Sequence, residues 1–105
     1  MKVATISTHV LDTARGEPVA GVRVMVTATA DDAVREGTTG PDGRFRFEEP
    51  VPLGGYQLHF DISDHVLSGA HLFQTVEFLV RLEEERHYHI PLLISPFGVS
   101  CYRGS

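Results

Sequence analysis

The sequence predicts an all-β sandwich with one short helix, and three observations lead to that prediction. Apolar and polar residues alternate, two residues to the repeat, along about seven short stretches. Turn-forming glycine and proline residues separate these stretches. Only residues 63–69 interrupt the alternation with a pattern typical of a helix. The whole chain, residues 1–105, is expected to fold as one domain of this kind.

Each alternating stretch is expected to form one strand. In order, the expected strands span residues 6–11, 22–29, 44–47, 56–62, 76–82, 87–95 and 99–103. A turn over residues 13–21 separates the first two strands. Pro41-Asp42-Gly43 is typical of a tight turn that leads into the third strand. In the helical segment, Ser63 is expected to cap the start of the helix and Gly69 to end it.

Composition and charge exclude several classes of protein. With 42% apolar and 22% charged residues, the chain has the composition of an ordinary globular protein. Its net charge of −5 gives no electrostatic attraction to nucleic acid or to an anionic membrane surface. Cys101 is the only cysteine, and it is expected to be buried as a small apolar residue rather than to act as a nucleophile. The first residues lack the apolar run of a signal peptide and no stretch is long enough to span a membrane, so a cytoplasmic protein is expected.

Strand parity brings several polar side chains to one outward face. In the strand 87–95 the apolar residues occupy the even positions, so His87 and His89 point together to the opposite face. In the first strand His9 points away from its apolar neighbours, and in the third strand Arg44 points away from the phenylalanines. The outward face of one sheet is therefore expected to gather His9, Arg44 and His89.

The same outward face carries Leu11 and Leu93. Large apolar residues on an outer face are typical of a surface that another subunit covers, so a site between subunits is expected there. Two other interpretations stay open: a solvated face on which His-x-His has no role, and a zinc site of His9, His87 and His89, for which no Cys/His spacing signature exists. The remaining histidines show no partner pattern and are expected at the surface or in loops: His59, His65 and His71.

Three longer segments match a known family. They are "ISTHVLDTARGEPVAGVRV" near the start, "GPDGR" in the middle and "HYHIPLLISPFGVSCYRGS" at the end. In this order, over nearly the whole chain, they resemble the transthyretin-related proteins. Within these, the closing Tyr-Arg-Gly-Ser and the retained histidines and arginine make the chain similar to the 5-hydroxyisourate hydrolase branch. Transthyretin, the thyroid-hormone carrier, lacks this ending.

The resemblance implies a transthyretin-like two-sheet β-sandwich, which agrees with the alternation along the chain. It also implies a homotetramer, a dimer of dimers, with sites in a channel at the subunit interface. The catalytic residues of the family fall on His9 of "THVLD", Arg44 of "DGR" and His89 of "HYH". The substrate-binding residues are those of the terminal tetrapeptide: Tyr102, Arg103, Gly104 and Ser105.

The activity that the resemblance implies is hydrolysis of 5-hydroxyisourate in purine and urate catabolism. This is a cyclic amidase reaction (EC 3.5.2 class) on a small-molecule substrate, and it needs no metal or organic cofactor. A water must lose a proton as it attacks a carbonyl, and a neutral imidazole is suited to that task. We therefore expect His9 and His89 to share the proton transfers. Arg44 stays charged and presents a planar fork, so we expect it to orient the anionic substrate.

The chain departs from the family pattern before its last four residues. The usual ending is close to "SPYGYSTYRGS", whereas here Phe97 replaces a tyrosine, Val99 an aromatic residue and Cys101 a threonine. Residues 72–75 stand where the family has a Phe-Phe-Pro-Glu motif. Val99 and Cys101 are expected near the site, which leaves a second hypothesis: a hydrolase or cyclase acting on another substrate in a biosynthetic pathway. A non-enzymatic, transthyretin-like binding protein is a third, against which the retained catalytic set argues.

Overall fold

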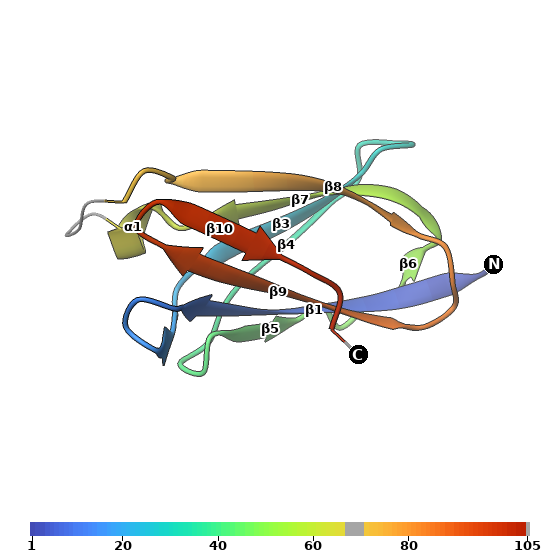
Figure 1. Cartoon of the computed structure of the whole chain (residues 1–105). Helices are drawn as coiled ribbons and strands as arrows, with labels where there is room; N and C mark the ends of the chain where they lie inside the picture. Colours follow the sequence, from blue (N-terminus) through green and yellow to red (C-terminus); the bar gives the residue numbers. More distant parts are fainter. Residues whose placement is uncertain (67–70, 105) are drawn as a thin grey trace.

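Two β-sheets packed face to face form the fold (Figure 1). The computed structural model describes residues 1–66 and 71–104. Within these residues the elements are β1 (Val3–Asp12), β2 (Glu17–Pro18), β3 (Arg23–Ala28), β4 (Val34–Thr38), β5 (Arg44–Arg46), β6 (Val51–Pro52), β7 (Gly54–Asp61), α1 (Ser63–Val66), β8 (Thr75–Leu82), β9 (His87–Ser95) and β10 (Gly98–Cys101). Every strand predicted from the alternation is present, so the prediction of an all-β sandwich with one short helix is confirmed.

The first sheet contains strands from both ends of the chain. Its strand order is β10-β9-β1-β2, and β5 and β6 also pair with β1. The second sheet has the order β4-β3-β7-β8. β1 and β9 run parallel, and Ser7 lies opposite His89 in their register. This pairing brings the N-terminal histidine motif next to the C-terminal one.

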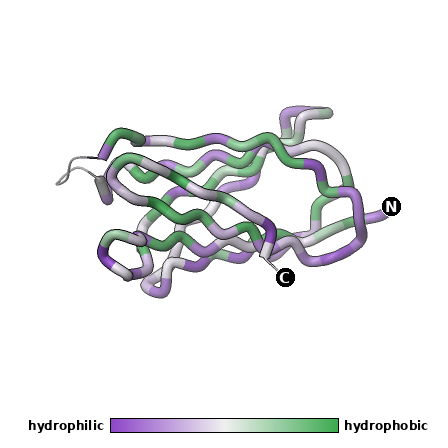
Figure 2. The backbone as a smooth tube through the Cα atoms, in the orientation of Figure 1, coloured by the Kyte–Doolittle hydropathy of each residue, from purple (hydrophilic) through white to green (hydrophobic). Residues whose placement is uncertain are grey.

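Alternate residues of both sheets fill the space between them. The colours along each strand in Figure 2 change from residue to residue, as expected for strands with one buried face. In β9 the predicted inward residues Tyr88, Ile90, Leu92 and Ile94 are all buried. The largest fully buried side chains come from both sheets and include Ile6, Leu58, Phe60, Leu82, Leu92 and Ile94. The two sheets thus share one core, and the polar side chains of the first sheet lie on its outer face.

The alternation did not predict β4, β2 or β6. β4 is an edge strand whose side chains are exposed or half-buried, and Val34 is 56% exposed, so no apolar face marks it in the sequence. It forms because β3 provides hydrogen-bonding partners from Arg23 to Thr27. β2 and β6 are two residues long and exist through their pairing with β1. Strands of these kinds depend on a neighbour rather than on their own sequence pattern.

The start of α1 differs from the sequence expectation. Ser63 was expected to act as the N-cap, but it is the first helical residue. The carboxylate of Asp61 accepts hydrogen bonds from the Ser63 N–H at 3.0 Å and from its hydroxyl at 2.6 Å. Asp61 is therefore the residue that satisfies the backbone at this end. Gly69, the predicted end of the helix, lies outside the described residues.

A buried carboxylate ties α1 to the end of β1. Asp12 is 1% exposed and accepts hydrogen bonds from the backbone N–H groups of Ala14 and Arg15, both at 3.0 Å. The Nε2 atom of His65 lies 2.7 Å from its second oxygen, so His65 is not an unpartnered surface residue as expected. Burial alone would raise the pKa of Asp12, but the hydrogen bonds from His65, Arg15 and Ala14 outweigh it and lower the pKa.

Replacement of this carboxylate is expected to destabilise the fold in a pH-dependent way. Asp12→Asn removes the charge that faces His65 and should lower the free energy of unfolding at pH 7 by about 1–3 kcal/mol. Because the folded pKa is lowered, the contribution of Asp12 is complete above the ordinary value of 3.8 and is lost as pH falls through the folded pKa. Urea unfolding of both proteins between pH 7 and pH 3 measures this, and the difference should shrink below about pH 4. Asp64→Asn, an exposed change in α1, is the control; a constant difference at all pH values would contradict the prediction.

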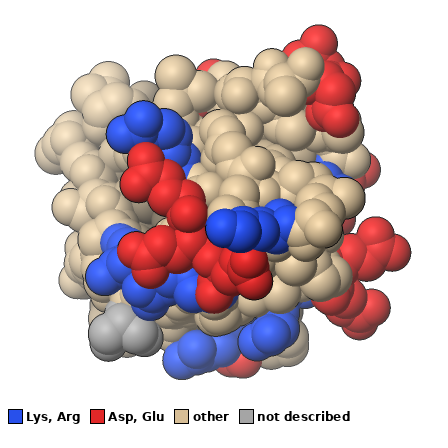
Figure 3. Space-filling model, turned by 90° about the vertical axis from the view of Figure 1, so that its right-hand side faces the viewer, with Lys and Arg blue, Asp and Glu red and all other residues tan. Residues whose placement is uncertain are grey.

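The described surface carries charges of both signs. On the end of the molecule seen in Figure 3, acidic and basic side chains lie next to one another at the centre and left of the view, and further acidic side chains lie along its right side. Among the described residues no helix has the length and apolar character needed to cross a membrane.

Candidate active site

Three strands of the first sheet bring the predicted catalytic residues to neighbouring positions. His9 of β1 lies opposite Arg44 of β5, and Ser7, two residues before His9, lies opposite His89 of β9. The side chains of residues 7 and 9 share the outer face of the sheet, so the three groups stand beside one another. A depression of about 300 Å³ on this face is lined by Ser7, Thr8, Asp42, Arg44, Phe45, Arg46 and His89.

A tight turn before β5 positions Asp42 and Arg44. The N–H of Gly43 donates to the carbonyl of Gly40 at 2.9 Å, and Gly43 has a φ of 77°, which favours glycine. The carboxylate of Asp42 accepts the backbone N–H of Arg44 at 3.0 Å. The predicted turn is thus present, and it holds the carbonyl of Asp42 towards His9.

The contact with this turn determines the tautomer of His9. Its Nε2 atom lies 2.9 Å from the carbonyl oxygen of Asp42. A carbonyl oxygen can only accept, so Nε2 must carry the proton. In the neutral ring Nδ1 then holds the lone pair, and His9 can act as a proton acceptor at that atom.

His89 is a half-buried imidazole held by Ser7. Its Nδ1 atom lies 2.8 Å from the Ser7 hydroxyl oxygen. Burial lowers the pKa of His89, and the electrostatic interactions with Arg44 and His9 lower it further. At neutral pH the ring is therefore neutral, the form that can either accept or donate a proton.

Arg44 supplies an exposed positive charge beside the depression. Its side chain is 58% exposed, and its Nε atom lies 3.9 Å from the carboxylate of Asp42. At that distance the ion pair is loose, so the guanidinium keeps donors for an anionic ligand. Two imidazoles beside a fixed cation can activate a water, protonate a leaving group and hold a developing negative charge.

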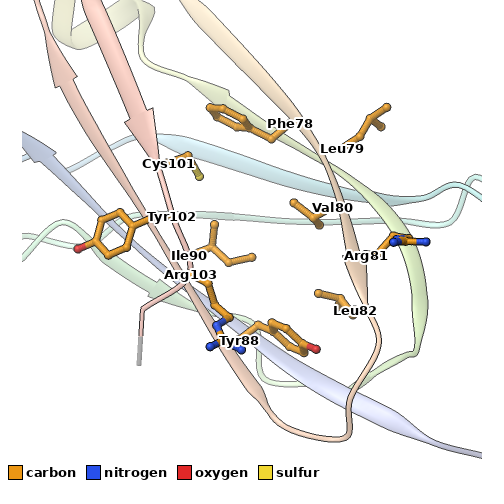
Figure 4. A pocket seen from close by; sticks show the side chains of 10 residues that line it. All are labelled: Phe78, Leu79, Val80, Arg81, Leu82, Tyr88, Ile90, Cys101, Tyr102 and Arg103. Carbon is orange, nitrogen blue, oxygen red and sulfur yellow. The ribbon is translucent and has the colours of Figure 1, made fainter.

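The C-terminal residues lie in two different places. Gly104 lies against His89: its N–H donates to the His89 carbonyl at 2.7 Å. Tyr102 and Arg103 instead line a second depression, of about 270 Å³, between β8 and β10. In Figure 4 Cys101 points into that space, whereas the ring of Tyr102 points away from β8. Ser105 lies outside the described residues.

A side chain at position 104 is expected to disturb His89. A Cβ atom added to Gly104 would stand 2.9 Å from Cδ2 of the imidazole, which is too close for two carbon atoms. Gly104→Ala should therefore displace the ring and lower kcat about 10-fold or more for any reaction that uses His89. The stability should change little, because residue 104 is near the end of the chain. Gly98→Ala, whose Cβ would meet only an ordinary contact at 3.5 Å, is the matched control, and equal kcat values for the two variants would contradict the prediction.

The two departures expected to alter the site lie on the other face of the sheet. Val99 pairs with Ile94 and Cys101 with Leu92, both fully buried, so the side chains of Val99 and Cys101 point inward. Both pack against the core, and neither belongs to the lining of the depression that holds Arg44. Cys101 instead lines the second depression, together with Tyr102 and Arg103. Burial also raises the pKa of the Cys101 thiol, which makes it a poor nucleophile at neutral pH.

The ring of His87 is engaged within the sheet. Its Nδ1 atom lies 2.6 Å from the Thr5 hydroxyl and its Nε2 atom 2.7 Å from the Ser7 hydroxyl. Across residues 1–66 and 71–104, no group of three His, Cys, Asp or Glu side chains is placed to hold a metal ion.

Sequence reasoning did not identify Ser7 and Thr5 as parts of the site. Parity places both residues on the same face of the strand as His9, so it could have identified them as neighbours of the site. Their contact with the histidines depends on the parallel register of β1 and β9, in which Thr5 lies opposite His87 and Ser7 opposite His89. No local pattern contains that register.

Comparison with known proteins agrees with the fold and with the motifs. A model described as the HIUase/Transthyretin family matches residues 6–104. A 5-hydroxyisourate hydrolase of Caulobacter vibrioides is 39% identical, and the match covers 95% of this chain and 97% of that protein. The solved structure of 5-hydroxyisourate hydrolase from Klebsiella pneumoniae has a TM-score of 0.85 at 31% identity, covering 97% of this chain and 94% of that one. Transthyretin from Sparus aurata, at 24% identity and a TM-score of 0.77 over 94% of this chain and 95% of that one, shares the fold.

Proposed function

Because this chain belongs to the HIUase/Transthyretin family, we propose that it hydrolyses 5-hydroxyisourate at a ring amide bond, as a cyclic amidase of purine and urate catabolism. The observation that carries the proposal is the grouping of His9, Arg44 and His89 on one outer face, in the register of β1, β5 and β9. The names of relatives that align over nearly their full length support the choice of substrate.

His9 and His89 share the proton transfers in the proposed reaction. A water attacks the ring carbonyl and gives one proton to an imidazole, which passes it to the nitrogen that leaves with the electron pair of the broken C–N bond. The other imidazole accepts the second proton of the water as the carboxylate forms. Donation from His9 Nε2 to the Asp42 carbonyl leaves Nδ1 as the accepting atom of that ring. The lowered pKa of His89 keeps its ring neutral and ready for either role.

Arg44 orients the anionic substrate and stabilises the oxyanion of the tetrahedral intermediate. Its guanidinium remains charged at any relevant pH and is exposed beside the depression. Gly104 packs against His89 and would keep the ring in place. Tyr102, Arg103 and Ser105 are proposed as substrate-binding residues of a complete site formed between subunits.

The direct test uses freshly generated 5-hydroxyisourate, made from urate with urate oxidase. The purified protein should accelerate the decay of its ultraviolet absorbance well above the rate in buffer. Arg44→Gln should raise KM and lower kcat, because the amide keeps hydrogen-bond donors but no charge. Arg23→Gln, which removes an exposed arginine of the second sheet, is the control. Decay at the buffer rate with folded wild-type protein would overturn the proposal.

We also propose the homotetramer, a dimer of dimers with the sites at the subunit interface. Exposed large apolar residues support it, including Leu79 at 79% and Phe97 at 74%, because such residues are typical of covered surfaces. Light scattering during size-exclusion chromatography gives the mass directly. A monomer that retained full activity would contradict the shared site.

A cytoplasmic location is proposed on the lone cysteine, which forms no disulfide within the chain.

A further inference from the structure

Four side chains on the outer face of the first sheet form one continuous hydrogen-bonded chain. Thr5 Oγ1 lies 2.6 Å from Nδ1 of His87, and Nε2 of the same ring lies 2.7 Å from Ser7 Oγ. Ser7 Oγ in turn lies 2.8 Å from Nδ1 of His89. The parallel register of β1 and β9 produces this arrangement, since Thr5 is opposite His87 and Ser7 is opposite His89.

The number of available protons limits how the hydrogen bonds among these four side chains can be oriented. A serine hydroxyl has one hydrogen to donate, and a neutral imidazole has one N–H. In two arrangements the hydrogen of the Ser7 hydroxyl is donated to one of the two histidines. In one, Ser7 donates to His89 Nδ1 and accepts from His87, so His89 presents an N–H at Nε2. In the other, His89 Nδ1 donates to Ser7 and Ser7 donates to His87, so His89 presents a lone pair at Nε2.

Neither histidine is charged in these arrangements, and the surroundings favour that. Burial lowers the pKa of His87, and the electrostatic interactions with Arg46, His89 and Arg86 lower it further. His89 is affected in the same way by burial, by Arg44 and by His9. The two rings therefore compete for any added proton, and one alone can take it at moderate pH.

We propose that His87 is a positioning residue for His89, and that Ser7 links the two rings into a relay which lets His89 change between proton acceptor and proton donor. The inference rests on the proposed function and extends it to residues outside the catalytic set.

The relay balances protons through one turnover. As the water oxygen bonds to the carbonyl carbon, its proton goes to Nε2 of His89. The Nδ1 proton of His89 moves to Ser7, and the Ser7 proton moves to Nε2 of His87, which becomes the cation. When the C–N bond breaks, the three transfers reverse and Nε2 of His89 protonates the leaving nitrogen. Positive charge thereby moves from the side of Arg44 and His9 to His87, which faces Arg46 and Arg86, while the intermediate exists.

The activity test compares variants that break or keep the link. Ser7→Ala and His87→Phe should each lower kcat about 10-fold to 100-fold, the size typical of groups that orient a reacting imidazole, with KM nearly unchanged. Ser7→Thr keeps the hydroxyl and should recover most of kcat. His59→Phe, a histidine on the second sheet bonded to Glu77, is the matched control and should leave kcat unchanged. If His87→Phe does not fold, the comparison of kcat between Ser7→Ala and Ser7→Thr tests the relay.

A second measurement needs no substrate. In protein labelled with ¹⁵N-histidine, the ring nitrogen shifts report which atom of His89 carries the proton. Ser7→Ala should change the tautomer populations of both His87 and His89, and Ser7→Thr should not. The relay is overturned if Ser7→Ala leaves the tautomers of His89 unchanged, or if it retains the wild-type kcat. Failure of the wild-type protein to turn over 5-hydroxyisourate would instead overturn the proposed function, and the spectra would still decide whether the rings are linked.

Discussion

A fall in kcat of about 10²- to 10⁴-fold is expected for each of the variants His9→Ala and His89→Ala, the range that a general acid or base contributes. The two rings stand on neighbouring positions of the same face, and neither can replace the proton transfer of the other. His9→Ala also leaves the Asp42 carbonyl without its donor, and His89→Ala removes the partner of Ser7. Decay of freshly generated 5-hydroxyisourate at saturating concentration measures kcat for each.

The control for these variants is His59→Ala, which removes an imidazole from the outer face of the second sheet. It should keep the wild-type kcat. Circular dichroism and thermal unfolding establish that each variant is folded. Wild-type rates in both folded His9→Ala and His89→Ala would exclude the proposed acid–base mechanism.

Gly43→Ala is expected to destabilise the protein by about 2–5 kcal/mol. A residue with a side chain costs about 1–2 kcal/mol at positive φ, and overpacking adds about 1–3 kcal/mol. Here φ is 77°, and the added Cβ would stand 2.5 Å from the backbone carbonyl oxygen of Val10. That carbonyl is part of rigid β1, so the turn must move. Urea unfolding measures the loss, and kcat should fall as well, because the turn holds Asp42 and Arg44.

Gly21→Ala provides a matched control for this variant. Gly21 has the same φ of 77°, but nothing lies within 4 Å of an added Cβ. It should lose about 1–2 kcal/mol, the penalty of the backbone conformation alone. The difference between the two variants isolates the clash with β1. Equal losses of stability would show that the close approach of Gly43 to Val10 does not matter.

Much of the fold could be predicted because alternation is a property of each strand. The even positions of β9 are buried as the parity predicted. β4 could not be predicted, because its residues have no apolar face and its pairing with β3 provides its stability. The role of Asp61 before the start of α1 was missed for a similar reason. Both Asp61 and Ser63 suit a helix start, and only the backbone path decides which one accepts the hydrogen bonds.

The candidate site could be predicted in its main residues but not in its connections. His9, Arg44 and His89 were expected together from parity and from the family resemblance, and they occupy adjacent positions in the sheet. The inward direction of Val99 and Cys101 was missed, because it follows from the antiparallel register of β10 with β9, which no local pattern contains. Parity also gave no indication that Tyr102 would line the second depression while Gly104 pairs with His89.

The sequence by itself determined which face of its strand each side chain occupies, because successive residues of an extended backbone point to opposite sides. It also determined the turn at residues 40–43, whose conformation depends on four neighbouring residues. Only the tertiary structure decided which side chains meet across strands. The Ser7–His89 hydrogen bond joins residues 82 positions apart, and the packing of two whole sheets sets the register that makes it.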